Sequence, residues 1–300
     1  MTADARPTGA TPVPVRPVRD RAAARSRLGR DRTPGWLYAV LAAGLVVMVL
    51  PFVWMVLSSI KPEADILADP SAWIPAEVTG ANYTRLASVL DMGGYFYNST
   101  VVAVTITLGN VAFGAMLGYA LAKLEFRGKR VLFAVVLGTL MVPGVVTFVP
   151  LFVLVTNLGL TNTLPGMFLP FLAAPFGVFL MRQFILGLPD DLIHAARVDG
   201  ASELRIFASV ILPLCRPALA TLAILTFLGS WNQFLWPLVV AQTEDKYTLP
   251  VGLALAAIGQ NSTDYGLLLA GAVVVVVPVI AVFLLLQRHF VQGIATTGIK

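Results

Sequence analysis

The side chains best suited to polar chemistry lie in residues 189–213, the only long polar segment in the second half of the chain. The segment has the sequence PDDLIHAARVDGASELRIFASVILP, with Ala195, Ala196 and Gly200 set among acids and bases. Small residues let another backbone come close. The pattern therefore predicts a surface that a second polypeptide segment can approach.

Other residue types that carry chemistry are sparse. The single cysteine, Cys215, excludes an internal disulfide and a cysteine metal site, and His194 and His289 are too distant in sequence to suggest a metal pair. The one Gly-Lys pair, at residues 128–129, lacks the Ser or Thr that completes a phosphate-binding loop. We therefore expect no catalytic residue, no metal, no bound cofactor and no ATP hydrolysis by this chain.

Residues 189–213 have the pattern of two short helices joined at a glycine, and we name this segment the elbow. Pro189 followed by two acids is typical of a helix start, because proline fits the first turn and acids suit the positive end of the helix dipole. Gly200 predicts the break between the helices. The apolar faces expected to pack inward are Leu192, Ala195 and Ala196 on the first helix and Leu204, Phe207, Val210 and Ile211 on the second.

The composition indicates an integral membrane protein. The chain has 300 residues, of which 57% are hydrophobic and 12% are charged, whereas soluble proteins carry about 25% charged residues. We expect an all-α fold with six transmembrane helices, because each uncharged stretch reaches the roughly 20 residues that a bilayer requires. The expected spans are residues 36–60, 98–122, 131–155, 164–181, 217–240 and 266–287.

The sequence also predicts kinks in one span and a tail at each end of the transmembrane domain. The fourth span carries Pro165, Pro170 and Pro175, so kinks are expected there. A transmembrane domain over residues 34–290 is expected to lie between a disordered basic tail at 1–33 and a short tail at 291–300.

The positive charges predict the orientation in the membrane. If the N-terminus is cytoplasmic, 18 of the 21 Lys and Arg residues are cytoplasmic, and only Lys61, Arg85 and Lys246 lie outside. An excess of Lys and Arg marks cytoplasmic loops. We therefore expect both termini and the elbow in the cytoplasm, and we interpret the basic tail as a topology determinant with no nucleic-acid partner.

A cluster of uncharged polar residues stands out within the predicted spans. Ser230, Asn232 and Gln233 offer hydrogen-bond donors and acceptors, Trp231 offers a ring for stacking, and Asn110 lies in another span. Two interpretations stay open. These residues either join helices by hydrogen bonds, or they line a pathway, because polar groups at membrane depth tend to face a cavity.

The elbow resembles the signature loop of bacterial ABC importer permeases. That loop has Glu-Ala-Ala, three residues, Gly, nine residues and Ile-x-Leu-Pro; this chain has Ala195-Ala196, Gly200 and residues 210–213 at the same spacing, with His194 in place of Glu. Residues 230–254 and 288–300 are similar to the matching segments of carbohydrate-uptake permeases, in particular the second membrane subunit of the maltose importer.

The resemblance implies a type I ABC importer transmembrane domain whose elbow docks on a separate ATPase. The residues implied in ATPase coupling are His194, Ala195, Ala196, Asp199, Gly200, Ala201, Leu212 and Pro213. The implied partners are a second homologous permease, two ABC ATPase subunits that hold ATP and Mg²⁺, an extracytoplasmic solute-binding protein and the lipid bilayer. The implied substrates are an oligosaccharide, a monosaccharide or glycerol phosphate, with Ser230, Trp231, Asn232, Gln233 and Asn110 as the candidate pathway.

Two alternatives to an ATP-driven permease remain at this point. A secondary carrier usually keeps an ionisable residue inside the membrane, and the predicted spans contain none. A membrane protein with a purely structural or assembly role would show no substrate-dependent ATPase activity after reconstitution.

Overall fold

The computed structural model describes residues 35–258 and 263–297; the predicted tail at 1–33 lies outside the described residues. The described part consists of helices joined by turns and loops, with one isolated bridge between Ile258 and Thr263. The helices, in order, are α2 (Gly35–Ser59), α3 (Glu63–Ala68), α4 (Ala81–Val89), α5 (Met92–Lys123), α6 (Lys129–Met141), α7 (Gly144–Asn157), α8 (Leu164–Phe168), η1 (Leu169–Phe171), α9 (Pro175–Leu186), α10 (Asp190–Val198), α11 (Glu203–Ile206), η2 (Phe207–Ile211), α12 (Leu212–Leu214), α13 (Arg216–Trp231), α14 (Leu235–Val240), η3 (Glu244–Lys246), α15 (Leu249–Ala257) and α16 (Tyr265–Thr297).

Apolar helices of membrane-spanning length confirm the all-α membrane class. In the described part of the chain, four helices are long and apolar enough to cross a bilayer, and six are reached if each of two bent helix pairs counts as one span. The chain divides into two compact units at Pro51, inside α2, and each unit is described by itself. The first contributes only the uncharged start of α2 to the described residues, and all features below belong to the second.

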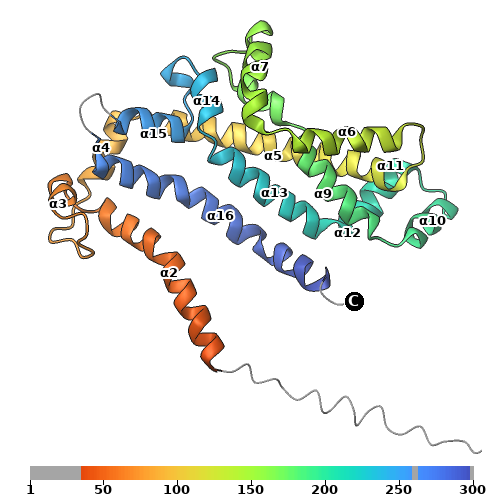
Figure 1. The fold of residues 1–300 in the computed structure, drawn as a ribbon, viewed down its shortest axis with the longest axis horizontal. Helices are drawn as coiled ribbons and strands as arrows, with labels where there is room; N and C mark the ends of the chain where they lie inside the picture. The colour runs from red at the N-terminus through yellow and green to blue at the C-terminus, as the bar shows by residue number, and fades with distance from the viewer. Residues whose placement is uncertain (1–34, 259–262, 298–300) are drawn as a thin grey trace, which may run out of the picture. The chain divides into compact units, whose positions relative to one another are not determined.

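Helix α5 is the central element of the second unit, with α9 and α13 packed along it (Figure 1). The close contact with α9 depends on two glycines four residues apart. A Cβ on Gly114 would lie 3.1 Å from the backbone of Gly177, and a Cβ on Gly118 would lie 2.7 Å from Met181 Cβ. Small residues at this spacing let two helix backbones approach closely within a membrane.

The two ends of α5 contact different loops, which lie at opposite ends of the unit in Figure 1. Near its start, the hydroxyl of Tyr95 donates to Glu244 Oε1 at 2.7 Å, and Asn98 donates to the carbonyls of Asp245 and Tyr247. Near its end, α5 contacts the elbow. One unbroken helix of 32 residues therefore connects the η3 loop with the elbow.

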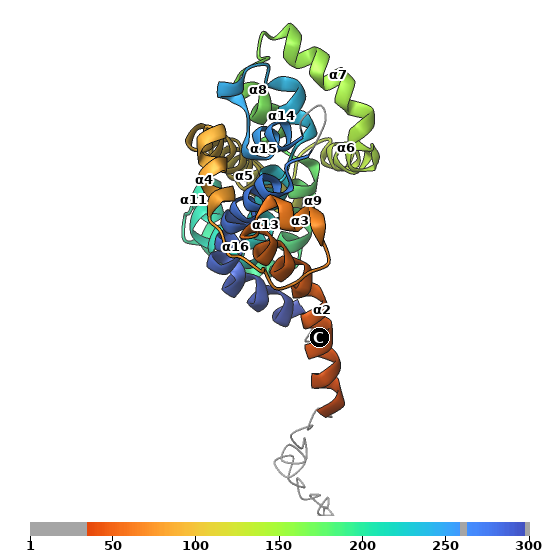
Figure 2. The same cartoon turned by 90° about the vertical axis from the view of Figure 1, so that its left-hand side faces the viewer.

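The third predicted span differs from the structure. The sequence predicts one continuous helix over residues 131–155, but α6 and α7 meet at 102° (Figure 2). Val142 and Pro143 between them are extended. A residue before proline is disfavoured in the helical conformation, so the chain leaves the helix at Val142 and starts a new one after Pro143.

The fourth and fifth predicted spans are also interrupted. The kinks expected from the prolines of the fourth span are present, since α8, η1 and α9 each have a proline in the first turn. The fifth span was expected as one helix over residues 217–240, whereas α13 ends at Trp231 and α14 starts at Leu235. The break places residues 232–234 outside regular helix, next to the polar cluster.

Candidate functional site

The elbow turns at Gly200, which has a φ of +78°. Helix α10 ends there with two backbone bonds, from Gly200 N to Arg197 O and from Ala201 N to Ala196 O, both at 3.0 Å. This pair of bonds satisfies the last carbonyls of a helix and requires a left-handed residue, for which glycine carries no side-chain penalty. The break predicted at Gly200 is therefore present, with a defined hydrogen-bond closure.

The inward faces of the elbow are only partly those expected. Phe207, Val210 and Ile211 contact the core, but Leu192, Ala195 and Leu204 are exposed, which corrects the predicted faces. The buried positions of the first two helices are Ile193 and Ile206. In α10 the inner side is therefore one residue further along than the predicted stripe.

The tip of the elbow presents large apolar side chains away from the protein. Val198 is 87% exposed and Leu204 is 80% exposed, on either side of Gly200, and Leu192 is exposed as well. Of the eight residues predicted for coupling, His194, Ala195, Asp199, Gly200 and Pro213 are exposed, and Ala196, Ala201 and Leu212 are half-buried. Five of the eight are therefore exposed on the same segment as the uncovered apolar tip.

Polar contacts tie the elbow to the end of α5. Lys123 Nζ donates to Asp190 Oδ1 at 2.6 Å and to Leu188 O at 2.7 Å. The hydrogen bond and the positive charge of Lys123 lower the pKa of Asp190 from its ordinary value. A second tie uses Glu203, which accepts from Tyr119 at 2.7 Å and from Arg197 at 2.8 Å.

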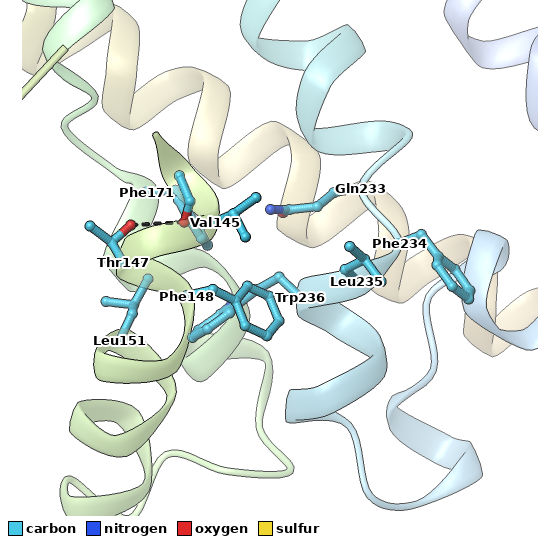
Figure 3. Close-up of a pocket in the computed structure, with 10 residues that line it drawn as sticks. Val145, Thr147, Phe148, Leu151, Phe171, Gln233, Phe234, Leu235 and Trp236 are labelled. Carbon is cyan, nitrogen blue, oxygen red and sulfur yellow. Dashed lines mark hydrogen bonds between the residues drawn. The ribbon is translucent and has the colours of Figure 1, made fainter. Parts of the chain in front are cut away.

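The break between α13 and α14 adjoins two cavities, and Gln233 lines both of them. The larger, of about 470 Å³, lies between α7 and α14, and Figure 3 shows the amide of Gln233 directed toward Val145. Its aromatic lining consists of Phe148, Phe171, Phe234 and Trp236. The smaller, of about 230 Å³, is lined by Asn110, Ser230 and Gln233 among other residues. Among the residues that the structure describes, no charged side chain lines either cavity.

The predicted pathway residues therefore divide into two groups. Asn110, Ser230 and Gln233 meet at the smaller cavity, although they come from α5 and from the end of α13. Trp231 is only 2% exposed, and its indole N–H donates to Val275 O at 3.0 Å, so its ring packs in the core instead of facing a cavity. The amide of Asn232 bonds to Leu228 O of its own helix.

Asn110 has a structural task at the edge of the smaller cavity. Its amide nitrogen donates to Ile106 O at 3.1 Å and Phe171 O at 2.6 Å, and its oxygen accepts from Ala174 N at 2.9 Å. These bonds satisfy the backbone groups that lack a helical partner where η1 ends and α9 begins. A backbone group left without a hydrogen bond inside a membrane costs free energy. The side chain has no donor hydrogen left for a ligand.

Some contributing residues were not predicted from the sequence. Tyr119, Lys123 and Glu203 anchor the elbow through contacts between distant segments. The ion pair of Arg197 with Glu203 was not predictable either, because the two residues are six positions apart across a glycine and helical pairing rules cover spacings of three and four. Val198 and Leu204 carried a usable signal, because each is a large apolar residue directly between two charged residues. In the described residues, no group of three or more His, Cys, Asp or Glu side chains is placed to hold a metal ion.

Comparisons with known proteins agree with this arrangement. Residues 110–296 match the family described as "Binding-protein-dependent transport system inner membrane component". The arabinooligosaccharides transport system permease protein AraQ of Halalkalibacterium halodurans is 39% identical over 271 residues, covering 88% of this chain and 96% of that protein. The diacetylchitobiose uptake system permease protein NgcG of Streptomyces coelicolor is 38% identical over 261 residues, covering 86% of each.

A solved structure shows the same fold. A chain of a bacterial ABC transporter involved in the import of alginate superposes with a TM-score of 0.76 at 24% sequence identity, covering 92% of this chain and 100% of that one. The family match spans more than half of the sequence, and the relatives cover most of it. With its elbow at the predicted spacing, this chain belongs to the binding-protein-dependent transport system inner membrane components, the permease family of ABC importers.

Proposed function

We propose that this chain is a permease subunit of an ATP-driven importer that carries a sugar across the cytoplasmic membrane. In this proposal, a second homologous permease completes the pathway and two ABC ATPase subunits bind ATP and Mg²⁺ and supply the energy. An extracytoplasmic solute-binding protein delivers the substrate. The family supports a transport role, and the relatives' names mention arabinooligosaccharides and diacetylchitobiose.

The observation that carries the proposal is the exposed tip of the elbow. Val198 and Leu204 remain uncovered although backbone bonds close the end of α10 and side chains tie the elbow to α5. Exposed apolar residues rimmed by polar ones mark protein-binding surfaces. We assign this surface to the ATPase, so that movement there reaches the membrane helices through α5.

The cavities favour a neutral sugar over glycerol phosphate. Neither cavity presents a described Lys, Arg or His that could balance a phosphate charge, and an unpaired charge inside a membrane is strongly disfavoured. Aromatic rings with a few amides and hydroxyls instead suit a sugar, whose ring faces are apolar and whose hydroxyls form hydrogen bonds. Gln233 is the residue that we assign to substrate contact.

The distribution of positive charge supports the orientation in this proposal. With 18 of 21 Lys and Arg residues on one side, the elbow and both termini are cytoplasmic and the η3 loop is extracytoplasmic. The elbow then faces the compartment that contains ATP, and the η3 loop faces the binding protein.

Reconstitution of the complete importer tests the proposal. The permease pair with its ATPases would be placed in proteoliposomes with ATP inside and the binding protein outside, and uptake of labelled neutral oligosaccharides would be measured. We expect uptake that stops with a non-hydrolysable ATP analogue and that glycerol phosphate does not inhibit.

Each alternative class of protein gives a different result in this assay. Uptake driven by an ion gradient without ATP would identify a secondary carrier. An absence of both uptake and substrate-stimulated ATP hydrolysis, across neutral sugars and glycerol phosphate, would overturn the proposed function.

A further inference from the structure

We propose that Glu203 is a positioning residue that sets the angle between the elbow and α5 during transport. The role rests on the proposed coupling function. Glu203 opens α11 on the far side of Gly200, and its side chain contacts two other segments. We call the contact of Tyr119, Glu203 and Arg197 the Glu203 bridge.

The two carboxylate oxygens of Glu203 have different partners. Oε2 accepts from the Tyr119 hydroxyl at 2.7 Å, and Oε1 accepts from Arg197 Nε at 2.8 Å. Tyr119 belongs to α5, and Arg197 belongs to α10. One carboxylate therefore joins the membrane helix to both helices that flank the glycine.

Packing fixes the position of the Tyr119 hydroxyl. The Tyr119 side chain is buried, and its ring lies 5.5 Å from the ring of Phe207 in η2, centroid to centroid. A buried ring leaves its hydroxyl little freedom to move. Glu203 must therefore come to Tyr119, and the elbow takes the angle that permits this contact.

The Glu203 bridge controls geometry more than overall stability. The Arg197 and Glu203 side chains are partly exposed, and exposed ion pairs contribute little to folding. Ile193 and Ile206 bury the elbow against the core independently of the bridge. Lys123 and Asp190 hold the start of α10, away from Gly200. Loss of the bridge should leave the elbow folded and attached but free to change its angle at the glycine.

Glutamine can preserve the bridge, whereas alanine cannot. In a Glu203→Gln variant, the amide oxygen can accept from Arg197 while the amide nitrogen donates to the Tyr119 oxygen. Glu203→Ala removes both contacts. Tyr119→Phe removes one hydrogen bond and keeps the ring against Phe207.

The decisive measurement is the amount of sugar imported per ATP hydrolysed by the full complex in proteoliposomes. We expect Glu203→Ala to lower this ratio roughly tenfold, which corresponds to about 1.4 kcal/mol of lost coupling free energy. Glu203→Gln should stay within about twofold of the parent, and Tyr119→Phe should lie between them.

A parent ratio in Glu203→Ala would overturn the inference. If that variant does not assemble with the ATPases, Tyr119→Phe decides, because its core packing is retained. A parent ratio in Tyr119→Phe then refutes the Glu203 bridge, and a several-fold loss supports it.

A distance measurement separates this inference from the proposed function. Spin labels at Val198→Cys and Phe126→Cys, both exposed positions, would be placed on the full chain in a Cys215→Ala background. We expect Glu203→Ala to broaden the distance distribution, and an unchanged distribution refutes the bridge. A broadened distribution in a protein whose parent shows no ATP-driven uptake would keep the bridge and reject the importer role.

Discussion

The helical chain bends at Gly200 and again at residues 232–234, and the two bends differ in chemistry. At Gly200 the backbone is left-handed, two bonds close the end of α10, and Glu203 ties both flanking helices to α5. At residues 232–234 neither Asn232 nor Phe234 has a positive φ, and the side chain of Gln233 extends along two cavities.

Under the proposed function, this difference would let one chain both receive force at the elbow and contain a pathway beside residues 232–234. A bend whose helix end is closed by backbone bonds and whose flanking helices are tied to α5 by Glu203 would behave as a rigid part, so displacement at its tip would reach the helices behind it. A bend that interrupts a membrane helix beside empty volume exposes polar groups where a substrate can meet them. Variants can test each half of this comparison.

Gly200→Val should have the largest effect. A β-branched residue is disfavoured by roughly 1–2 kcal/mol at positive φ, and the altered turn would move Val198 and Leu204 away from the ATPase. Transport-linked ATP hydrolysis by the reconstituted complex should be lost. Gly138→Val is the matched control, because Gly138 lies in α6 with open space around its Cβ position. If Gly200→Val keeps normal transport-linked ATP hydrolysis, the bend at Gly200 is not needed for coupling, and the proposed difference between the two bends is wrong.

Asn110→Leu should have the next largest effect, and on stability. It would leave the carbonyl of Phe171 and the N–H of Ala174 without their partner, at a cost of about 2 kcal/mol. Thermal unfolding of the purified complex would show a lower midpoint. Ser230→Ala, at the same cavity, is the control and should unfold like the parent. Equal midpoints for both variants would contradict the structural role of Asn110.

Gln233→Ala should alter transport without altering stability. Loss of one uncharged hydrogen bond to a sugar corresponds to a rise of up to about tenfold in the KM for uptake. Asn232→Ala should leave the KM unchanged, because its amide already bonds to Leu228 O. Uptake assays with several neutral sugars would measure both variants. If Gln233→Ala imports every sugar like the parent, the pathway is elsewhere.

Asp190→Asn should have the smallest effect. The side chain of Asp190 is mostly exposed, and water screens its ion pair with Lys123. Its pKa is lowered from 3.8 in the folded protein, so its contribution is complete above that value and is lost as the pH falls through the lower folded pKa. Because the ion pair is exposed, the difference in unfolding midpoint between parent and variant should be small, and it should not change between about pH 6 and pH 8. A clear difference in that pH range would mean that Asp190 contributes more than Glu203 to the attachment of the elbow to α5.

The elbow was predictable because its signals are local. Pro189, the two acids after it and Gly200 each act on their nearest backbone neighbours, and the structure has the helix start and break at those positions. The facing residues were less predictable: Leu192 and Leu204 were expected inside but are exposed, because burial depends on where α5 and α9 lie. The Glu203 bridge depends on those same tertiary contacts.

The interruptions of the membrane helices were only partly predictable. The prolines of the fourth span indicated its kinks. Pro143 lies in an apolar stretch long enough for a membrane span, and its length alone predicted one continuous helix there. The break at residues 232–234 has no glycine or proline, and Asn232 alone does not distinguish a turn from a polar residue within a span. Trp231 illustrates the limit: its residue type suits ring stacking with a ligand, but only tertiary structure shows that its indole N–H bonds to Val275 O.

Helix α5 has a tyrosine near each end whose hydroxyl bonds to a glutamate on another segment: Tyr95 with Glu244 and Tyr119 with Glu203. The two tyrosines are 24 positions apart, which corresponds to about 36 Å of unbroken helix. If such a rod pivots near its middle during the proposed transport cycle, a tilt that moves one attachment inward moves the other outward. Opening on one side of the membrane and closing on the other would then be a single mechanical event, with no separate signal needed to keep the two gates from opening together.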